Sequence, residues 1–314
     1  MKKQILLYCI GMLGMFTLSQ CSKNGPGEPD YPYRYDSLIF DNSKIEKDVV
    51  YGSAVTQGGA NIDLKMDIYG PEGDEATKRA LIILAHGGSY VAGDKNEFSQ
   101  LASFLSKSGY VVASVNYRLI DVAVDPTSLK KAIIDAIFDM KQTVAFFHDE
   151  SAKYKIDVSK IFVGGYSAGA FTALHFGYLN SDAEITTFGG TTILDYVNSE
   201  GGLDGNGGND NVGVEIKGVI NIAGALLKAG FINSANDPAL YSFHGTADMV
   251  VPYLEGDAAG SGIITQGAGL LHPVADNLGI ANRLNTIQGG DHGVFFTYCN
   301  GCFYHMRGFL FELL

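Results

Sequence analysis

The feature that most constrains this chain is a serine held between two glycines, where a short apolar run meets a long one. Residues 160–170 read Lys-Ile-Phe-Val-Gly-Gly-Tyr-Ser-Ala-Gly-Ala. The run Ile161–Val163 is too short for a helix and suits a strand covered on both faces, whereas Ala168–Leu179 is long and mostly apolar, as in a buried helix. Glycines two residues before and after Ser167 allow a sharp turn that presents its hydroxyl at the sheet edge. Ser167 is therefore a candidate nucleophile.

The rest of the chain predicts strands alternating with helices. A hairpin is expected first, from Val49–Thr56 and Ile62–Tyr69. Buried strands are then expected at Ala80–Ala85, Tyr110–Asn116, Ile216–Ala223, Leu240–His244 and Leu284–Gln288, and helices at Glu97–Ser108, from Pro126 onward, at Leu270–Leu278 and at Phe303–Leu313. This alternation predicts an α/β fold whose mostly parallel, twisted sheet carries helices on both faces.

One domain, residues 48–314, accounts for this pattern. With 314 residues, 46% of them hydrophobic, the chain can bury a substantial single core. Residues 180–214 differ, because many glycines, acids and little periodicity predict an irregular excursion over the top of the sheet. The motif Asp125-Pro126 is a helix start, with the carboxylate as cap and the proline in the first helical position.

The N-terminus predicts export. Residues 1–20 combine Lys2 and Lys3 with the apolar stretch Ile5–Leu18, which is typical of a signal peptide. The sequence Leu18-Ser19-Gln20-Cys21 resembles a bacterial lipoprotein signal, so we expect a lipid on Cys21 and a tether over residues 21–47. The protein would then be a cell-envelope lipoprotein on the periplasmic or cell-surface side. Ordinary secretion, with cleavage nearby and a free Cys21, is the alternative.

The chain is acidic. Its formal net charge is −12. Removing the signal peptide takes away two lysines and no acid, which leaves the mature chain more negative still. Nucleic acid and anionic lipid surfaces are therefore poor electrostatic partners, and a neutral substrate is favoured.

The histidine best placed to act as a base is His292, in the loop Gly289–Gly293 after the last predicted strand. Acyl transfer by serine needs a base close to the hydroxyl and an acid that orients the base. The acid is assigned to Asp248, directly past another strand, and not to Asp291, because adjacent side chains on a turn diverge. The order Ser, Asp, His is typical of hydrolases with this sheet.

The other histidines considered receive structural or surface positions. A core position is expected for His175, and His244 is expected to hold the loop of Asp248. Exposed helix positions are expected for His148 and His305, and His272 has no distinguishing context. Donors for the oxyanion are expected from the backbone amides of Gly88, Ser89 and Ala168, which follow a strand or begin a helix.

Four motifs together resemble the α/β-hydrolase superfamily, in particular carboxylesterases similar to the hormone-sensitive-lipase and feruloyl-esterase-like groups. The motifs are His86-Gly87-Gly88-Ser89, Gly165-Tyr166-Ser167-Ala168-Gly169, His244-Gly245-Thr246-Ala247-Asp248 and Asp291-His292-Gly293. The resemblance implies attack of Ser167 on an ester carbonyl, with His292 as base, Asp248 steadying it, an acyl-enzyme intermediate and no metal or other cofactor. Ser89 stands where many relatives have a third glycine, and no N-terminal helical cap precedes the hairpin.

Two other functions remain open beside a general serine carboxylesterase. A carbohydrate esterase that removes acetyl or feruloyl groups from polysaccharide would differ only in its leaving alcohol. A tethered binding protein on a catalytically dead scaffold is of another class, and the presence of all three triad residues argues against it. A peptidase of the prolyl-oligopeptidase type is disfavoured because the chain is too short for that family's propeller.

Two weaker signals concern ligands and cross-links. The stretch Leu203–Asp210 alternates oxygen-bearing residues with glycines but lacks the final glutamate of an EF-hand, so a lid loop is favoured over a calcium site. Cys299 and Cys302 lie close together just before the closing helix. Because the chain is expected to be exported and has no second cysteine pair of this kind, a local disulfide is predicted in place of a zinc or redox site.

Overall fold

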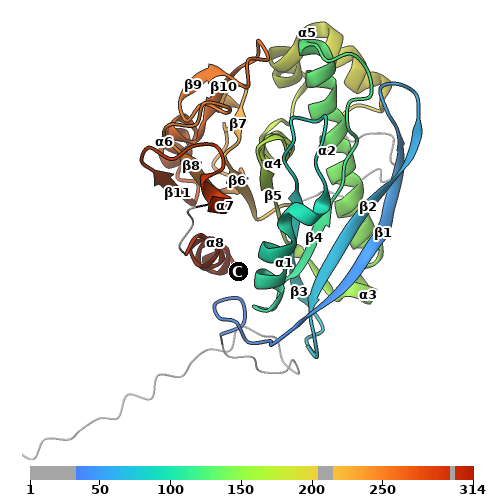
Figure 1. The fold of residues 1–314 in the computed structure, drawn as a ribbon, viewed down its shortest axis with the longest axis vertical. Helices are drawn as coiled ribbons and strands as arrows, with labels where there is room; N and C mark the ends of the chain where they lie inside the picture. The colour runs from blue at the N-terminus through green and yellow to red at the C-terminus, as the bar shows by residue number, and fades with distance from the viewer. Residues whose placement is uncertain (1–32, 204–214, 298–300) are drawn as a thin grey trace, which may run out of the picture.

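An eight-stranded, mostly parallel sheet forms the centre of the molecule (Figure 1). The structure is a computed structural model and describes residues 33–203, 215–297 and 301–314. In spatial order the strands are β1 (Ser43–Val55), β2 (Asn61–Pro71), β4 (Val111–Val115), β3 (Arg79–Ala85), β5 (Ile156–Tyr166), β6 (Gly218–Ile222), β8 (Ala239–Gly245) and β11 (Asn282–Ile287). β2 pairs antiparallel with β1 and β4, and every other pairing in this sheet is parallel.

Helices cover both faces of the sheet, which confirms the predicted fold class. One face packs on α2 (Pro126–Asp149), α4 (Ala168–Tyr178) and α6 (Ala268–Leu278), and the other packs on α1 (Ser99–Ser106) and α8 (Cys302–Glu312). Alternate residues of β3 divide between the two cores: Leu81 and Ile83 face one, and Ile82 and Leu84 face the other. This is why the central strands are apolar at nearly every position, without the alternation of a half-exposed strand.

The start of α2 follows the predicted capping chemistry. The Asp125 carboxylate accepts hydrogen bonds from the backbone N–H groups of Thr127 and Ser128, both at 2.8 Å. The Ser128 hydroxyl in turn accepts from the N–H of Asp125 at 2.8 Å, which completes a capping box. Such a cap contributes about 1 kcal/mol. It fixes where the helix begins, and with it one wall of a cavity described below.

The prediction that residues 180–214 are irregular is wrong for the first half of that segment. Asp182–Ser199 forms helix α5, capped by Ser181 and kinked at Gly190, where φ is +71°. Ile185, Phe188, Ile193 and Val197 bury one side of it. Glycines and threonines weaken local helix propensity, but burial of this apolar stripe outweighs that cost. Residues 204–214, which include most of the calcium-like stretch, lie outside the described residues.

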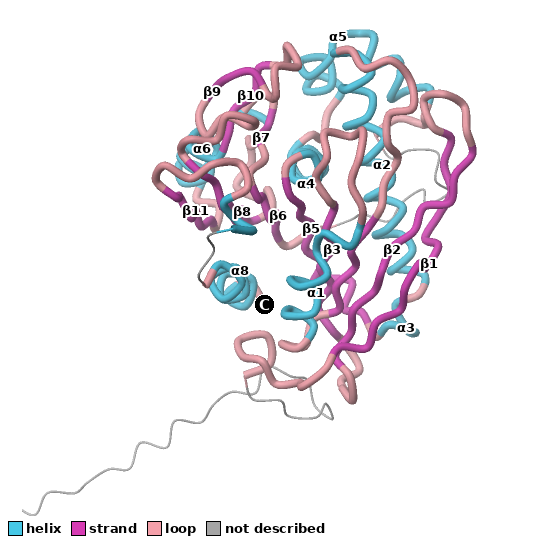
Figure 2. The backbone as a smooth tube through the Cα atoms, in the orientation of Figure 1, coloured by secondary structure: helices cyan, strands magenta, loops and turns pink. Residues whose placement is uncertain are grey.

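The predicted start of the domain at residue 48 is also wrong. β1 begins at Ser43, within the stretch assigned to the tether. It forms a long hairpin with β2 (Figure 2). Even earlier, the Tyr35 hydroxyl accepts a hydrogen bond from the N–H of Ala80 at 2.9 Å, and both Arg34 and Tyr35 are buried. Residues 33–47 therefore belong to the fold. The predicted signal peptide and Cys21 lie outside the described residues.

A small second sheet and several short helical turns complete the description. Strands β7 (Ala225–Leu226), β10 (Ile264–Gly267) and β9 (Glu255–Asp257) form a three-stranded antiparallel sheet that the sequence did not predict. The remaining short elements are η1 (Lys95–Phe98), α3 (Ser151–Tyr154), η2 (Ala229–Phe231) and α7 (Val294–Thr297). No helix within residues 33–203, 215–297 or 301–314 is both long and apolar enough to cross a bilayer.

Candidate active site

The turn between β5 and α4 holds Ser167 in a strained backbone conformation. Its φ is +52° and its ψ is −118°, a region that residues other than glycine rarely adopt and that costs roughly 1–3 kcal/mol. The flanking glycines are required by close contact: a Cβ on Gly169 would lie 1.9 Å from the carbonyl oxygen of Ala85, and one on Gly165 would lie 2.4 Å from the carbonyl carbon of Gly169. The serine is thus presented on a turn wedged against the end of β3.

Ser167, His292 and Asp248 meet at the carboxyl edge of the sheet. The Nε2 atom of His292 lies 2.9 Å from the Ser167 Oγ, and its Nδ1 lies 2.7 Å from the Asp248 Oδ2. Because an ionised carboxylate only accepts hydrogen bonds, Nδ1 carries the proton and Nε2 is left to accept from the serine hydroxyl. This is the tautomer that a general base for serine requires. The Asp291 carboxylate instead accepts from the N–H of Gly293 at 3.0 Å.

Asp248 is held by donors on both oxygens. Oδ1 accepts from the backbone N–H groups of Val250 and Val251 at 2.9 and 2.8 Å, and the Nε2 of buried His244 lies 3.3 Å from Oδ2. Burial raises the pKa of Asp248, but hydrogen bonds from His244, His292 and the N–H of Val251 outweigh it, so the pKa lies well below its usual range. The carboxylate therefore stays ionised beside the imidazole.

The expected oxyanion donors remain available for a ligand. Gly88 adopts a φ of +111°, and a Cβ there would lie 2.0 Å from the carbonyl oxygen of Ala92. Ser89 follows it, also with positive φ. None of the hydrogen bonds among the described residues uses the backbone N–H of Gly88, Ser89 or Ala168. Ala168 is moreover the first residue of α4, where the helix dipole favours negative charge.

Tyr90 connects the loop that carries Gly88 and Ser89, called the donor loop below, to its surroundings. The sequence did not indicate this role. Its hydroxyl donates to the carbonyl oxygen of Ala168 at 2.8 Å and lies 3.1 Å from the Thr172 Oγ1. Its own carbonyl accepts from the N–H of Ile120 at 2.7 Å. The loop carrying Gly88 and Ser89 is therefore joined both to the nucleophile helix and to the loop after β4. A tyrosine beside the glycine motif was the only local signal.

Two more side chains that the sequence did not single out lie beside the triad. The Tyr166 ring packs 5.0 Å from the His292 ring, centroid to centroid, and its hydroxyl donates to the carbonyl oxygen of His292 at 3.2 Å. The Glu97 carboxylate accepts from the N–H of Gly87 at 2.6 Å and so braces the start of the donor loop. Glu97 stands in a 3₁₀ turn ten residues after Gly87, and no motif marks it, so only the fold reveals its contact.

The other histidines do not contact Ser167. His175 is fully buried: its Nδ1 donates to the carbonyl oxygen of Phe171 at 2.8 Å, and burial lowers its pKa to about 4 despite that bond. It is a core residue, as expected. His244 serves the loop of Asp248, with its Nε2 3.0 Å from the carbonyl oxygen of Val251. The remaining positions are buried His272, beside Asn282, and His148 and His305 on α2 and α8.

The described residues test the calcium-site and disulfide predictions only in part. Among the described residues, no group of three or more histidine, cysteine, aspartate or glutamate side chains is arranged to hold a metal ion. Asp204–Asp210 of the calcium-like stretch fall outside these residues, so that expectation stays a prediction. Cys302 is disulfide-bonded, while its predicted partner Cys299 lies outside the described residues.

Comparison with known proteins gives a consistent set of esterases. Residues 66–226, slightly more than half of the chain, match the family described as BD-FAE. A probable isoprenylcysteine alpha-carbonyl methylesterase of Oryza sativa subsp. japonica is 24% identical over 268 residues, which cover 74% of this chain and 55% of that protein. The chain spans about half, or less, of the length of the curated relatives it matches.

Solved structures share the fold. The butyrate-bound esterase 2 of Thermogutta terrifontis is 19% identical with a TM-score of 0.62, over 90% of this chain and 97% of that one. A truncated carbohydrate esterase from gut microbiota is 22% identical with a TM-score of 0.57, over 87% of this chain and 96% of that one. At such identities the likeness shows a common fold and nothing finer.

Proposed function

The chain belongs to the BD-FAE family, and on that premise we propose that it is a carboxylic-ester hydrolase with Ser167 as its nucleophile. The observation that carries the proposal is the pair of hydrogen bonds joining Asp248, His292 and Ser167 at 2.7 and 2.9 Å. Relatives named as a methylesterase and an acetyl esterase support ester chemistry.

The proposed reaction begins when the Ser167 Oγ attacks the ester carbonyl carbon. The hydroxyl proton passes to the Nε2 of His292, and Asp248 stabilises the resulting imidazolium. Negative charge develops on the carbonyl oxygen, where the N–H groups of Gly88, Ser89 and Ala168 would donate to it. Collapse breaks the bond to the alcohol, which leaves with the proton from His292 and gives an acyl-serine.

Water completes the cycle. His292 takes a proton from a water molecule as that water attacks the acyl carbonyl, and the same proton returns to the Ser167 Oγ as the acid leaves. Every proton transfer in this scheme uses His292, and every charge that develops has a group of the chain or water beside it. The scheme needs no cofactor.

A second candidate is narrower, a carbohydrate esterase that removes acetyl or feruloyl groups. Its support is the fold shared with the gut-microbiota carbohydrate esterase, together with an acidic chain that favours neutral substrates. The third, a catalytically dead binding protein, is disfavoured because a hydrogen-bonded Ser167 and His292 have no role in such a protein.

The experiment that tests the enzyme is covalent labelling combined with an ester panel. A fluorophosphonate probe should label Ser167, as located by peptide mass spectrometry, and p-nitrophenyl esters of increasing length, acetylated oligosaccharides and feruloylated oligosaccharides should rank the substrates. Absence of labelling together with absence of hydrolysis across the panel would leave the binding protein as the better function.

We also propose that the protein is exported and anchored by a lipid on Cys21, on the basis of the sequence Leu18–Cys21. Metabolic labelling with a fatty-acid analogue tests this. The label should appear on the natural chain and disappear in Cys21→Ser, whereas equal labelling of both would contradict the anchor.

A further inference from the structure

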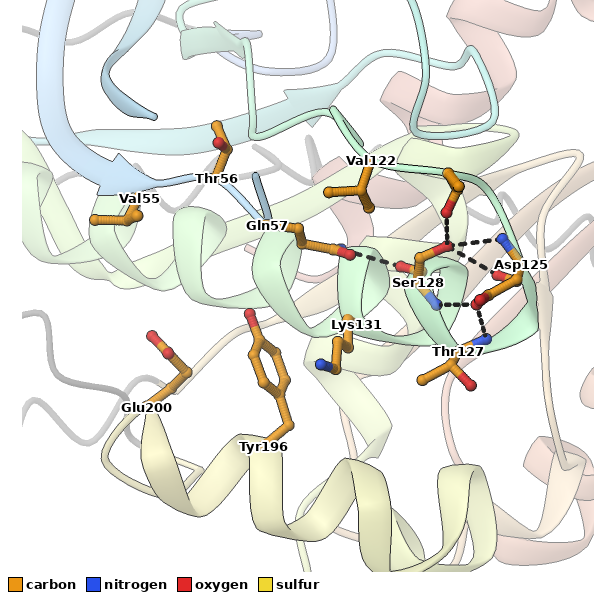
Figure 3. A pocket seen from close by; sticks show the side chains of 11 residues that line it. Val55, Thr56, Gln57, Val122, Asp125, Thr127, Ser128, Lys131, Tyr196 and Glu200 are labelled. Atoms are coloured by element: carbon orange, nitrogen blue, oxygen red, sulfur yellow. Dashed lines mark hydrogen bonds between the residues drawn. The ribbon is translucent and has the colours of Figure 1, made fainter. Parts of the chain in front are cut away.

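A cavity of about 440 Å³ lies away from the triad, between the hairpin turn and helices α2 and α5 (Figure 3). One wall is the end of β1, Val55–Gln57, and another is the loop and first turns of α2. The third is the end of α5, from which the Tyr196 ring points into the space (Figure 3). None of its lining residues belongs to the triad or to the oxyanion donors.

The walls of this cavity are preformed by hydrogen bonds. The Gln57 Nε2 donates to the carbonyl oxygen of Ser128 at 3.0 Å, which joins the hairpin turn to α2. The Tyr196 hydroxyl donates to the Asp135 Oδ1 at 2.5 Å, which joins α5 to α2. Asp125 is committed to its helix cap. A ligand would therefore enter a site whose shape exists without it, and preformed sites lose less free energy on binding.

Three polar groups lining the cavity have no such commitment. Among the described residues, no hydrogen bond or ion pair engages the Thr127 hydroxyl, the Lys131 ammonium or the Glu200 carboxylate. The Lys131 ammonium lies over the Tyr196 ring, 4.8 Å from its centroid, and its charge also acts on the carboxylates of Asp125 and Asp135. The site thus offers a donor, an acceptor and a hydroxyl that is both.

This combination selects the class of ligand. Lys131 lies in the same lining as the carboxylates of Asp125 and Glu200, so a ligand charge of either sign would be repelled by at least one of these groups. Hydroxyl groups both donate and accept, so a neutral polyhydroxylated ligand can satisfy all three free groups at once. The apolar side chains of Val55 and Val122 and the Tyr196 ring provide contact for C–H surfaces.

The cavity lies at the same edge of the sheet as the triad, because the end of β1 lines it. β1 is antiparallel to β2, and β2 is antiparallel to β4, so β1 runs in the same sense as β5 and both strands end at one edge. Three strands separate them. At about 4.8 Å per strand spacing, four spacings separate β1 and β5 by roughly 20 Å across the sheet. Only an extended chain could reach both.

We infer that this cavity is a distal subsite for the neutral oligosaccharide part of an ester substrate. The inference rests on the proposed ester hydrolase function, because it makes the cavity one end of that enzyme's substrate site. The hydrogen bond between Ile120 and Tyr90, at 2.7 Å, links the loop that continues into the cavity wall with the loop of the oxyanion donors. A saccharide bound at the distal end would hold its ester over Ser167.

Binding is measured first, without turnover, on the full chain carrying Ser167→Ala. Xylohexaose and cellohexaose are the neutral probes, and an oligogalacturonate of matched length is the anionic one, each followed by calorimetry. At least one neutral probe should bind. Adding Lys131→Met and Glu200→Gln should weaken its binding roughly tenfold or more, because hydrogen bonds to charged groups are the stronger ones. Lys130→Met, one residue along the same helix, is the matched control and should leave binding unchanged.

Thr127→Val is a second variant that keeps the shape of the cap region, and it should weaken binding a few-fold. Thermal melting checks that each variant is folded. The subsite is refuted if no neutral probe binds, if the double substitution and Thr127→Val leave the affinity intact, or if the anionic probe binds at least as tightly.

Turnover separates this inference from the proposed function. With Ser167 restored, Lys131→Met/Glu200→Gln should raise KM for acetylated xylohexaose or cellohexaose roughly tenfold and leave kcat/KM for p-nitrophenyl acetate unchanged, since that ester is too short to reach the cavity. Saccharide binding without hydrolysis of either ester would refute the enzyme and leave the cavity as a saccharide-binding site only. Hydrolysis of p-nitrophenyl acetate without saccharide binding would refute the subsite and keep the enzyme.

Discussion

The triad and the distal cavity differ in the hydrogen-bond partners of their polar groups. At the triad, the oxygens and nitrogens of Ser167, His292 and Asp248 bond to one another or to the adjacent backbone. In the cavity the walls are hydrogen-bonded, while Lys131 and Glu200 make no hydrogen bond or ion pair among the described residues. Groups that react must be oriented before the substrate arrives, because misplacement raises the barrier. Groups that recognise a ligand keep their hydrogen bonds for it. Substitutions in the triad should therefore impair the chemical reaction, whereas substitutions in the cavity should impair recognition of the ligand.

The largest expected effect is that of Ser167→Ala. Removing the hydroxyl removes the nucleophile, so hydrolysis of p-nitrophenyl acetate should fall by roughly 10⁴-fold or more. The melting temperature should stay close to that of the natural chain, because the backbone turn is set by its flanking glycines. A variant that keeps most of its esterase activity would remove Ser167 from its role and dissolve the contrast between the two regions.

Next in size is Asp248→Asn. The asparagine amide can donate to Nδ1 of His292, which favours the tautomer with its proton on Nε2, where the serine proton must go. We expect kcat to fall roughly 10³- to 10⁴-fold. Stopped assays over a range of substrate concentrations separate kcat from KM, and a change confined to KM would contradict an orienting role for this carboxylate.

The same variant makes a prediction about pH and stability. The pKa of Asp248 is lowered in the folded protein, so its charge stabilises the fold above the unfolded value of about 3.9, and this contribution is lost as pH falls below it. The difference in unfolding free energy between the natural chain and Asp248→Asn should therefore be constant above about pH 5 and narrow below about pH 4. Denaturant titrations at several pH values measure it. A difference that stays constant into strong acid would contradict the lowered pKa.

A smaller effect is expected from Gly169→Ala. The added Cβ would lie 1.9 Å from the carbonyl oxygen of Ala85, so the turn must shift, at a cost of about 1–3 kcal/mol in unfolding free energy. Activity should fall at least tenfold because Ser167 moves with the turn. Gly230→Ala is the matched control, since a Cβ there has no atom within 4 Å. Equal stability of the two variants would show that the turn can relax.

The smallest effect is expected from Tyr166→Phe. It removes only the hydrogen bond to the carbonyl oxygen of His292 and keeps the ring packing. A bond of about 1 kcal/mol corresponds to a loss of roughly fivefold in kcat/KM. Matched measurements with Thr127→Val, in the distal cavity, should show no change with p-nitrophenyl acetate. If the two variants behaved alike with this short ester, the division between reacting and recognising groups would not hold.

Much of the arrangement of Ser167, Asp248 and His292 could be predicted, because its determinants are local. The Gly-x-Ser-x-Gly turn follows the strand that its short apolar run predicts, the loops holding Asp248 and His292 also follow strands directly, and parallel strands bring their carboxyl ends to one edge. The start of α2 could be predicted for the same reason, since the capping Asp125 and the following Pro126 are adjacent in the sequence.

What the sequence could not predict depends on contacts between distant segments. Helix α5 contains residues of weak helical propensity, and only burial of Ile185 and Phe188 against the core explains it. The short strand β10 pairs with β7 and β9 over a few residues each, too few for a periodic signal. The distal cavity is formed by the hairpin, α2 and α5 together, so the sequence of no single one of these segments predicts it.

Tyr90 has a consequence for redesign. By bonding to Ala168, and through its own backbone to Ile120, it makes the donor loop, the nucleophile helix and the strand-to-helix connection leading toward the cavity into one rigid joint. None of the side chains that line the cavity takes part in these hydrogen bonds, since they come from the hairpin, from α2 with its preceding loop, and from α5. We expect that they can be exchanged without loosening it, so in the proposed esterase the preference for one substrate over another and the speed of the chemical step should be adjustable independently.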